Sequence, residues 1–342
     1  MSLTINDTTI RLDERAKIEI PVADLYTGTE ITMPAYVINA KTPGPTLFVS
    51  AAIHGDELNG IEIVRRLISL KTLKLSTGTL IAVPMVNVYG VLNQSRYMPD
   101  RRDLNRSFPG STKGSLAARV ADRFLKEIVS QCDYGIDLHT GAIHRSNLPQ
   151  IRADLSDKET LSLAKCFGVP VLLNANLRDG SLRQSATDSG TKILLYEAGQ
   201  ALRFDELSIK AGLKGILNVM SQLGMIKKKP SRTRTHKKVE PFVASNSSWV
   251  RAEESGIVRD LKQLGDSVNK GDVLANIGSP FGEINAEVIA NKSGIIIGKQ
   301  NIPLVQEGDA MFHIAYFKED DHEIAENIEN LQENFLLEDK LD

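Results

Sequence analysis

The sequence predicts an α/β fold, in which helices flank a central mixed sheet, followed by a small all-β domain. Three observations lead to this prediction. Short, strongly apolar runs alternate with segments of helical periodicity between residues 46 and 224. A basic segment without hydrophobic periodicity follows, and beyond it short β-type runs are separated by glycine turns and repeat once. Alternating strands and helices indicate a largely parallel or mixed sheet with helices on both faces.

Length and composition limit the number of domains and the kinds of partner that this protein can have. The chain has 342 residues, more than the roughly 100–200 residues of a typical domain, which favours two domains. Its net charge of −2 gives no reason to expect nucleic acid or a membrane surface as a partner. No apolar run reaches the roughly 18 residues that span a bilayer, and the first residues are polar, unlike a secretory signal. We therefore expect a cytoplasmic protein, with Cys132 and Cys166 as reduced thiols.

Each element of the first domain follows from a local pattern. Residues 8–40 alternate apolar and polar residues in short runs, as antiparallel or edge strands do. Residues 46–53 form a short, β-rich apolar run that predicts a buried strand, and residues 58–70 carry apolar residues at helical spacing. The same reasoning assigns strands to 78–87, 134–139, 169–174 and 192–199, and helices to 116–129, 160–168 and 209–224.

The C-terminal part has a different pattern. Residues 252–277 and 290–314 share the frame A-x-x-S-G-I, then V-x-x-G-D, then a closing isoleucine. Two copies of a strand–turn–strand unit predict a small β-sandwich with internal two-fold symmetry. The predicted division is a catalytic domain at 1–226, a basic linker at 227–241, a β-domain at 242–317 and an acidic tail at 318–342, which is a helix or partly disordered.

Polar residues stand at or just beyond the ends of several predicted strands. His54 follows one buried strand directly, His139 ends another, and Glu197 lies near the end of a third. Ligand sites in open α/β sheets gather at such strand ends, so we expect these residues to meet. Glu57 stands three residues after His54, and two histidines with one glutamate are a known ligand set for catalytic zinc. The sequence therefore predicts one zinc ion per chain.

Four ordered motifs, HGDE, DLNRSFPG, DLHTG and YEAG, resemble those of the succinylglutamate desuccinylase/aspartoacylase family, which is related to the zinc carboxypeptidases. The resemblance covers about residues 45–225 and implies a zinc-carboxypeptidase-like sheet. It also implies roles for individual residues. The residues matched are His54, Glu57 and His139 as zinc ligands, Asp103 as the carboxylate that orients a ligand histidine, Asn105 and Arg106 as the pair that holds a substrate carboxylate, and Glu197 as the general base.

Further arginines are candidates for substrate binding. An acyl-transfer reaction needs positive charge or hydrogen-bond donors for its oxyanion, and Arg96, Arg101 and Arg102 are near the matched motif. Their spacing does not choose among them. Arg178 and Arg183, which precede the last predicted strand, are candidates for a second substrate carboxylate.

The C-terminal repeat resembles the barrel-sandwich hybrid fold of biotinyl and lipoyl carrier domains. The turn between its halves, residues 278–287, contains no lysine and so offers no attachment point for a swinging cofactor. We therefore predict that this domain acts as a structural or gating lid over the zinc site.

The predicted function is a zinc-dependent hydrolase that cleaves an N-acyl amino acid or a related small amide bearing a carboxylate. A metallocarboxypeptidase or an esterase with the same site stays open, as does a non-catalytic metal-binding interaction protein. The expected partner is a small carboxylate-bearing molecule, with neither nucleic acid nor membrane, and assembly of several copies of the chain is left open.

Overall fold

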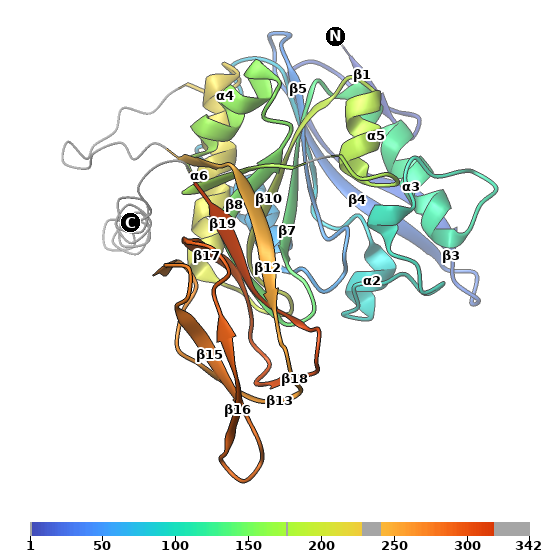
Figure 1. Ribbon diagram of the computed structural model, residues 1–342. Helices are drawn as coiled ribbons and strands as arrows, with labels where there is room; N and C mark the ends of the chain where they lie inside the picture. Colours follow the sequence, from blue (N-terminus) through green and yellow to red (C-terminus); the bar gives the residue numbers. More distant parts are fainter. Residues whose placement is uncertain (1, 176, 228–240, 318–342) are drawn as a thin grey trace.

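The computed structural model describes residues 2–175, 177–227 and 241–317, shown as coloured ribbon in Figure 1. The predicted basic linker, apart from its two end residues, and the predicted acidic tail lie outside the described residues. Helices pack on both sides of a large mixed sheet, and a module of β-strands extends from one end of it (Figure 1). The predicted fold class is confirmed.

A 13-stranded mixed sheet forms the centre of the molecule. Along its main path the strand order is β12-β19-β17-β8-β10-β7-β5-β6-β4-β3. The middle strands β10, β7, β5 and β6 run parallel, so their carboxyl ends share one edge. The strands before the C-terminal module are β3 (Glu14–Asp24), β4 (Glu30–Asn39), β5 (Thr46–Ala51), β6 (Thr79–Val83), β7 (Tyr134–Gly141), β8 (Arg145–Ala153), β9 (Val171–Asn174) and β10 (Lys192–Gln200), with a separate hairpin of β1 (Leu3–Ile5) and β2 (Thr8–Ile10).

Helices bury the two faces of this sheet in separate cores. One face packs against α1, α4 and α6, and the other against α3 and α5. Apolar side chains at helical spacing explain both contacts, since each helix turns one stripe toward the sheet. The helices are α1 (Asn59–Ser69), α2 (Val88–Leu92), α3 (Leu116–Glu127), α4 (Lys158–Phe167), α5 (Leu182–Asp188) and α6 (Glu206–Gln222), with short 3₁₀ turns η1 (Leu104–Arg106) and η2 (Val129–Gln131). Within the described ranges, no helix is long and apolar enough to cross a membrane.

The C-terminal module consists of β-strands and follows the sequence repeat. The first copy, together with the strand before it, contributes β12 to β15, and the second copy, together with the strand before it, contributes β16 to β19. The two halves exchange strands: β12 pairs β19, β16 pairs β15, β13 pairs β18, and β14 pairs β17. A core of its own fills the space between the strands. The strands of this part are β11 (Phe242–Ala244), β12 (Asn246–Arg251), β13 (Gly256–Asp260), β14 (Ser267–Val268), β15 (Val273–Gly278), β16 (Ile284–Ile289), β17 (Gly294–Gln300), β18 (Leu304–Val305) and β19 (Ala310–Tyr316).

The module continues the central sheet through backbone pairing. Strand β17 pairs antiparallel with β8, with Gly298 opposite Asn147, and β11 pairs parallel with β9. A small core at this junction mixes side chains of both parts, such as Leu148 with Ile295 and Ile297. The predicted division into two domains stays a prediction, and one sheet runs across the boundary that it draws.

Several elements differ from the sequence prediction. Strand β8 was not predicted, because its sequence RSNLPQIRA contains a proline and does not alternate cleanly between apolar and polar residues. Helix α5 was not predicted either, since its seven residues are too few to show helical periodicity. The strands β3 and β4 are longer than the short runs that the sequence suggested.

Candidate metal centre

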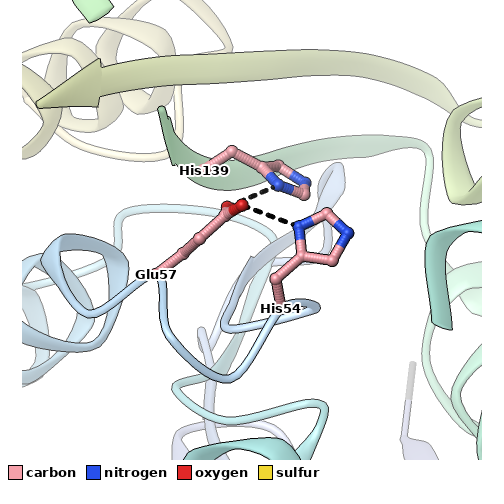
Figure 2. Close-up of side chains that lie close together, drawn as sticks. All are labelled: His54, Glu57 and His139. Atoms are coloured by element: carbon pink, nitrogen blue, oxygen red, sulfur yellow. Dashed lines mark hydrogen bonds and ion pairs between the residues drawn. The ribbon is translucent and has the colours of Figure 1, made fainter. Parts of the chain in front are cut away.

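Two histidines and a glutamate converge at the carboxyl edge of the parallel strands. His54 and Glu57 lie in the turn between β5 and α1, and His139 lies on β7. Figure 2 shows the Glu57 carboxylate facing both imidazole rings, with a dashed line to each. His54 Nδ1 is 2.8 Å from Glu57 Oε1, and His139 Nδ1 is 2.8 Å from Glu57 Oε2. All three side chains are buried, and their ligand atoms lie within 4.8 Å of one another.

The local backbone explains the spacing of the HGDE motif. After β5 the chain turns at Ala52, whose φ of 53° lies in the left-handed region. A β-carbon at Gly55 would lie 1.8 Å from the carbonyl carbon of Gly90, so only glycine fits between His54 and Glu57. The α2 segment that approaches so closely is held by Asn87, whose Oδ1 accepts a 2.8 Å hydrogen bond from the Gly90 amide.

Both histidines are oriented by a second carboxylate. His54 Nε2 is 3.0 Å from Asp103 Oδ1, and His139 Nε2 is 2.7 Å from Asp137 Oδ2. Ser50 Oγ donates to the other oxygen of Asp137 at 2.7 Å, which fixes that carboxylate. A carboxylate at Nε2 favours a proton there and leaves the Nδ1 lone pair directed at the centre.

Charge coupling dominates the protonation of this cluster. Burial alone lowers the pKa of His139, but the charges of Asp137 and Glu57 outweigh it and raise this pKa well above its ordinary value. Burial likewise opposes the charged form of Glu57, yet the two histidines bring its pKa well below the usual range. Burial alone raises the pKa of Asp103, but His54 and Arg96 outweigh this effect, so the pKa of Asp103 lies below its usual value. The carboxylates are therefore anions that favour a cation between them.

The donor set fits a zinc ion. Zinc prefers imidazole nitrogen and carboxylate oxygen, and a catalytic site supplies three protein ligands and leaves one position open. Here two Nδ1 atoms and the Glu57 carboxylate converge, while the far nitrogen of each imidazole is already engaged. The same pattern, a metal-binding histidine backed by a carboxylate, is common at zinc sites.

Arg96 lies beside this centre. Its Nη1 donates to Glu57 Oε1 at 3.2 Å and its Nη2 donates to Asp103 Oδ2 at 3.0 Å. Burial lowers the pKa of Arg96, and the two carboxylates more than offset this, so the guanidinium stays charged. Arg96 is the one of the three arginines near the DLNR motif that the structure brings to the metal centre.

A cavity of about 390 Å³ opens onto the metal centre. Asn105, Arg106 and Arg178 line it. Asn105 is held in place because its Oδ1 accepts a 2.9 Å hydrogen bond from the Leu182 amide. Among the residues that the structure describes, no carboxylate forms an ion pair with Arg106 or Arg178. Burial and the nearby charge of Arg178 lower the pKa of Arg106, which is the electrostatic condition that an anionic ligand relieves.

Glu197 enters the same cavity from β10. It lies in register with His139 on the neighbouring parallel strand, so the two side chains share one face of the sheet. Asn147 Nδ2 donates to Glu197 Oε2 at 2.6 Å, and Arg152 Nε lies 3.4 Å from Glu197 Oε1. The surroundings of this carboxylate are therefore polar, although the strand that carries it is apolar in sequence.

Not every predicted arginine reaches the cavity. The side chain of Arg102 is 64% exposed, it pairs with Asp100 at 3.9 Å, and it does not line the cavity, so the assignment of Arg102 to substrate binding stays a prediction without support from this geometry. Arg101 is also exposed, at a left-handed turn. Arg183 does line the cavity, and its Nη1 donates to the Ala175 carbonyl at 2.8 Å. Spacing could not separate Arg96, Arg101 and Arg102 because an irregular loop sets the directions of their side chains.

Sequence reasoning missed five residues of the site. Asp137 could have been found from the D-x-H spacing, since residues two apart in a strand share a face. Arg145, Asn147 and Arg152 are on β8, which was not predicted as a strand. Trp249 comes from β12 of the C-terminal module, and only the tertiary structure brings it to the cavity.

The sequence is similar to that of known enzymes over most of its length. The profile of the succinylglutamate desuccinylase/aspartoacylase catalytic domain matches residues 43–223. The N-alpha-acetyl-L-2,4-diaminobutyric acid deacetylase of Halomonas elongata is 26% identical over 308 residues, which cover 87% of this chain and 90% of the deacetylase. The match to the deacetylase therefore includes the C-terminal module as well as the metal centre.

Solved structures share the fold. The product-bound structure of the ectoine utilization protein EutE (DoeB) from Ruegeria pomeroyi superposes with a TM-score of 0.79 at 25% identity, covering 90% of this chain and 97% of the other. A succinylglutamate desuccinylase/aspartoacylase from Rhodobacter sphaeroides superposes with a TM-score of 0.77 at 23% identity, covering 90% and 98%.

Proposed function

Because the chain belongs to the succinylglutamate desuccinylase/aspartoacylase family, we propose that it is a zinc-dependent hydrolase that cleaves the amide bond of a small N-acyl amino acid. The observation that carries this proposal is the convergence of His54, Glu57 and His139 in a cavity that also holds Glu197. A protein that only binds a metal needs His54, Glu57 and His139 but has no need of Glu197, because it requires no general base. The kind of bond follows the deacetylase from Halomonas elongata, whose name describes removal of an acetyl group from an amino acid nitrogen.

Substrate binding falls to the arginine side of the cavity. Arg106 presents a planar guanidinium that matches a carboxylate, and Asn105 stands beside it with its amide already oriented. Arg178 adds a second positive charge nearby. We assign the carboxylate of the amino acid to this group, which places the acyl–nitrogen bond toward the metal centre.

The residues of the centre then divide the chemistry. Zinc, when bound by His54, Glu57 and His139, supplies a Lewis acid that polarises a carbonyl and lowers the pKa of water toward about 7. Glu197 accepts a proton on its carboxylate and later delivers it to the leaving nitrogen. The Asn147 amide and Arg152 hold that carboxylate in place. Arg96, which is bonded to Glu57 and Asp103 beside the centre, is the cation that we assign to the oxygen on which negative charge develops.

We further propose that residues 1–226 form the catalytic domain and that residues 242–317 wall one side of its cavity. Trp249 of the module lines the cavity together with the catalytic residues, which supports this division of labour. A fixed wall of this kind favours small substrates over long peptides.

A hydrolysis screen tests the proposal. Zinc-loaded protein is offered N-acetyl, N-succinyl and N-formyl amino acids, with dipeptides and an acetyl ester as comparison substrates, and release of free amine is measured. We expect turnover of at least one N-acyl amino acid, loss of turnover after zinc is removed with a chelator, and recovery when zinc is added back. Arg102→Ala, which alters an exposed arginine outside the cavity, is the matched control and keeps wild-type rates. Cleavage of dipeptides alone would identify a carboxypeptidase instead.

A further inference from the structure

The C-terminal module exposes apolar side chains on its second sheet. This sheet has the strand order β16-β15-β13-β18 and is separate from the central one. Figure 1 shows β15 and β16 projecting from the end of the molecule, away from the helices of the catalytic part. On or beside these strands, five large apolar side chains that take no part in the core of the module are between 44% and 64% exposed. They are Ile257, Leu261, Ile284, Ile289 and Leu304. Exposed apolar side chains gathered in this way indicate an interface.

The middle of this sheet carries a row of polar side chains. Arg259 of β13 pairs with Asn276 of β15, which pairs in turn with Glu287 of β16, so the three side chains share one face. Their neighbours Val258 and Val288 pack in the core of the module on the opposite face. The face that carries Arg259, Asn276 and Glu287, here called the outer face, is therefore turned away from that core.

An apolar row lies on each side of this polar row. On one side, Gly278 of β15 pairs both with Ile257 of β13 and with Ile284 of β16. On the other side, Leu261 and Ile289 each follow the polar row by two residues, and β13 and β16 run in the same direction because both are antiparallel to β15. Each edge of the outer face is thus apolar, charged and apolar in order, with a positive charge on β13 and a negative charge on β16.

This pattern is complementary to itself. Two stacked sheets lie about 10 Å apart with nearly aligned strands. If a two-fold axis runs along β15 between two such faces, β13 of one copy lies over β16 of the other. Arg259 then faces the partner's Glu287, and apolar residues face apolar residues: Ile257 opposite the partner's Ile284, and Leu261 opposite the partner's Ile289. An axis across the strands would instead set Arg259 against its own copy, which repulsion between like charges disfavours.

We propose that the outer face is an isologous interface through which two copies of this chain form a dimer. Arg259 and Glu287 supply two symmetric ion pairs, and the apolar rows on either side exclude water from them. Among the residues that the structure describes, neither Arg259 nor Glu287 forms an ion pair within its own chain. No residue of the outer face lines the cavity, so this inference does not rest on the proposed function.

The size of the outer face sets the strength that we expect. Four strands about 4.8 Å apart, with about five residues each at roughly 3.4 Å, give a face of about 19 by 17 Å. A face of this size lies at the small end of specific interfaces. We therefore expect a dimer that dissociates in the micromolar range.

Exchange of the charges tests both the interface and its axis. Sedimentation velocity follows the full chain from about 1 to 100 μM, where we expect a shift from monomer to dimer. Arg259→Glu sets glutamate opposite the partner's Glu287, and Glu287→Arg sets arginine opposite the partner's Arg259, so each variant alone should self-associate at least about tenfold more weakly. In an equimolar mixture of the two variants, every changed residue faces its opposite charge. The mixture should therefore recover the dimer.

Apolar substitutions complete the test. Ile284→Asn, within the outer face, should also weaken self-association by about tenfold or more. The matched control Leu12→Asn changes an exposed leucine in the turn before β3 and should leave self-association unaltered. Circular dichroism checks that each variant is folded.

Three results would overturn the proposal. The first is a wild type that stays monomeric at about 100 μM, which would leave the outer face to a different protein. The second is self-association that both charge variants leave unchanged, which would place the contact elsewhere on the chain. The third is a mixture of Arg259→Glu and Glu287→Arg that stays as weak as its components. A failure of the proposed hydrolysis would leave this test untouched, because the test measures association alone.

Discussion

At the scale of single residues, Glu57 is the organising group of the metal centre. Its two oxygens each contact a different histidine, and the Thr140 amide donates a further 3.1 Å hydrogen bond to Oε2. Each histidine is backed in turn by an aspartate, one from the loop before η1 and one from β7 itself. The centre is therefore a chain of alternating carboxylates and imidazoles, in which every member is fixed by its neighbours.

The backing carboxylates should tune zinc affinity. Asp137→Asn removes the charge that orients His139, and we expect zinc affinity to fall by about 10- to 100-fold without loss of the fold. His139→Ala removes a ligand and should abolish stoichiometric zinc. Competition with a coloured chelator measures the affinity, and elemental analysis measures the content. Asp188→Asn, an exposed substitution outside the cavity lining, serves as control. Full zinc affinity in Asp137→Asn would contradict the role given to this residue.

Glu197 should matter for rate and not for metal binding. Glu197→Gln keeps the size of the side chain but cannot take a proton, and loss of a general base typically costs about 10²–10⁴-fold in kcat. Zinc content should match the wild type, because Glu197 is not among the converging ligands. Single-turnover kinetics and elemental analysis on the same preparation check both points. An unchanged kcat would move the base to another carboxylate, with Asp56 the first to test, since Asp137 is already bonded to His139 and Ser50.

The sequence predicted part of this residue-scale picture. The three ligands and Asp103 stand in short motifs, and such motifs survive because the chemistry fixes both residue type and spacing. Among the arginines the sequence could not choose Arg96 over Arg102, since a loop of irregular backbone decides which of them turns inward. The charge of a residue can be read from a sequence, but its direction in a loop cannot.

At the scale of elements, β8 shows why a functional strand is hard to predict. One face of β8 lies against the cavity, so Asn147 and Arg152 stand where an ordinary buried strand would carry valine or isoleucine. The strands that were predicted, such as β5 and β6, have apolar residues on both faces. A prediction that relies on hydrophobic pattern therefore misses β8, because the residues that face the site on this strand are polar.

Helix α1, which begins just after the metal ligands, should owe some stability to a buried glutamate. Glu62 accepts hydrogen bonds from Arg65 and Arg66, at 2.5 to 2.8 Å, and Arg66 continues to Glu206 of α6. The Arg65 hydrogen bond contributes most, with help from Arg66, to lowering the pKa of Glu62 to about 2 against the effect of burial. We expect Glu62→Gln to reduce the free energy of unfolding at pH 7 by on the order of 1–2 kcal/mol, allowing for the solvent exposure of Arg65.

The sign of the pH dependence follows from this lowered pKa. The folded-state value lies below the ordinary value of 4.5, so the contribution of Glu62 is complete above about pH 4.5 and is lost as the pH falls through about 2. The difference between the wild type and Glu62→Gln should therefore shrink between these limits. Urea unfolding at pH 7, 4 and 3 measures it, with the exposed Glu254→Gln as control. A difference that grows on acidification would be inconsistent with this account.

At the scale of the whole molecule, a change at the junction between the C-terminal module and the catalytic part should alter the shape of the cavity and leave metal binding intact. A β-carbon at Gly298 of β17 would lie 3.0 Å from Asn147 Oδ1, 3.0 Å from the His313 β-carbon and 3.4 Å from the Trp249 ring. The side chain introduced by Gly298→Val would therefore clash both with Asn147, which holds Glu197, and with the side chains of Trp249 and His313. We expect kcat/KM to fall about tenfold or more, with zinc content unchanged.

A matched substitution separates this effect from a general loss of β-structure. Asn285→Val adds a similar side chain to an exposed position of β16, away from the junction, and should leave kcat/KM unaltered. Thermal unfolding followed by circular dichroism checks that both variants are folded. Equal effects of the two substitutions would indicate that the module acts only through overall stability.

The arrangement of the whole chain was predictable only in pieces. The repeat predicted a β-module of two similar halves, and the alternating pattern predicted the body. What joins them is the pairing of β17 with β8, which brings together residues some 150 positions apart through backbone hydrogen bonds. Backbone pairing leaves almost no trace in side-chain identity, and so neither the continuous sheet nor the place of Trp249 could be inferred.

The same pairing has a consequence for how such a protein acquires new substrates. Its hydrogen bonds come from the main chain, so side chains on β12 and β19 can be exchanged while the frame between module and body stays intact. The metal ligands sit on other segments, β7 and the turn after β5, and do not share this freedom. Substrate selectivity can therefore change during evolution while the reaction is kept, because the side chains that determine each of them lie on different strands of one sheet.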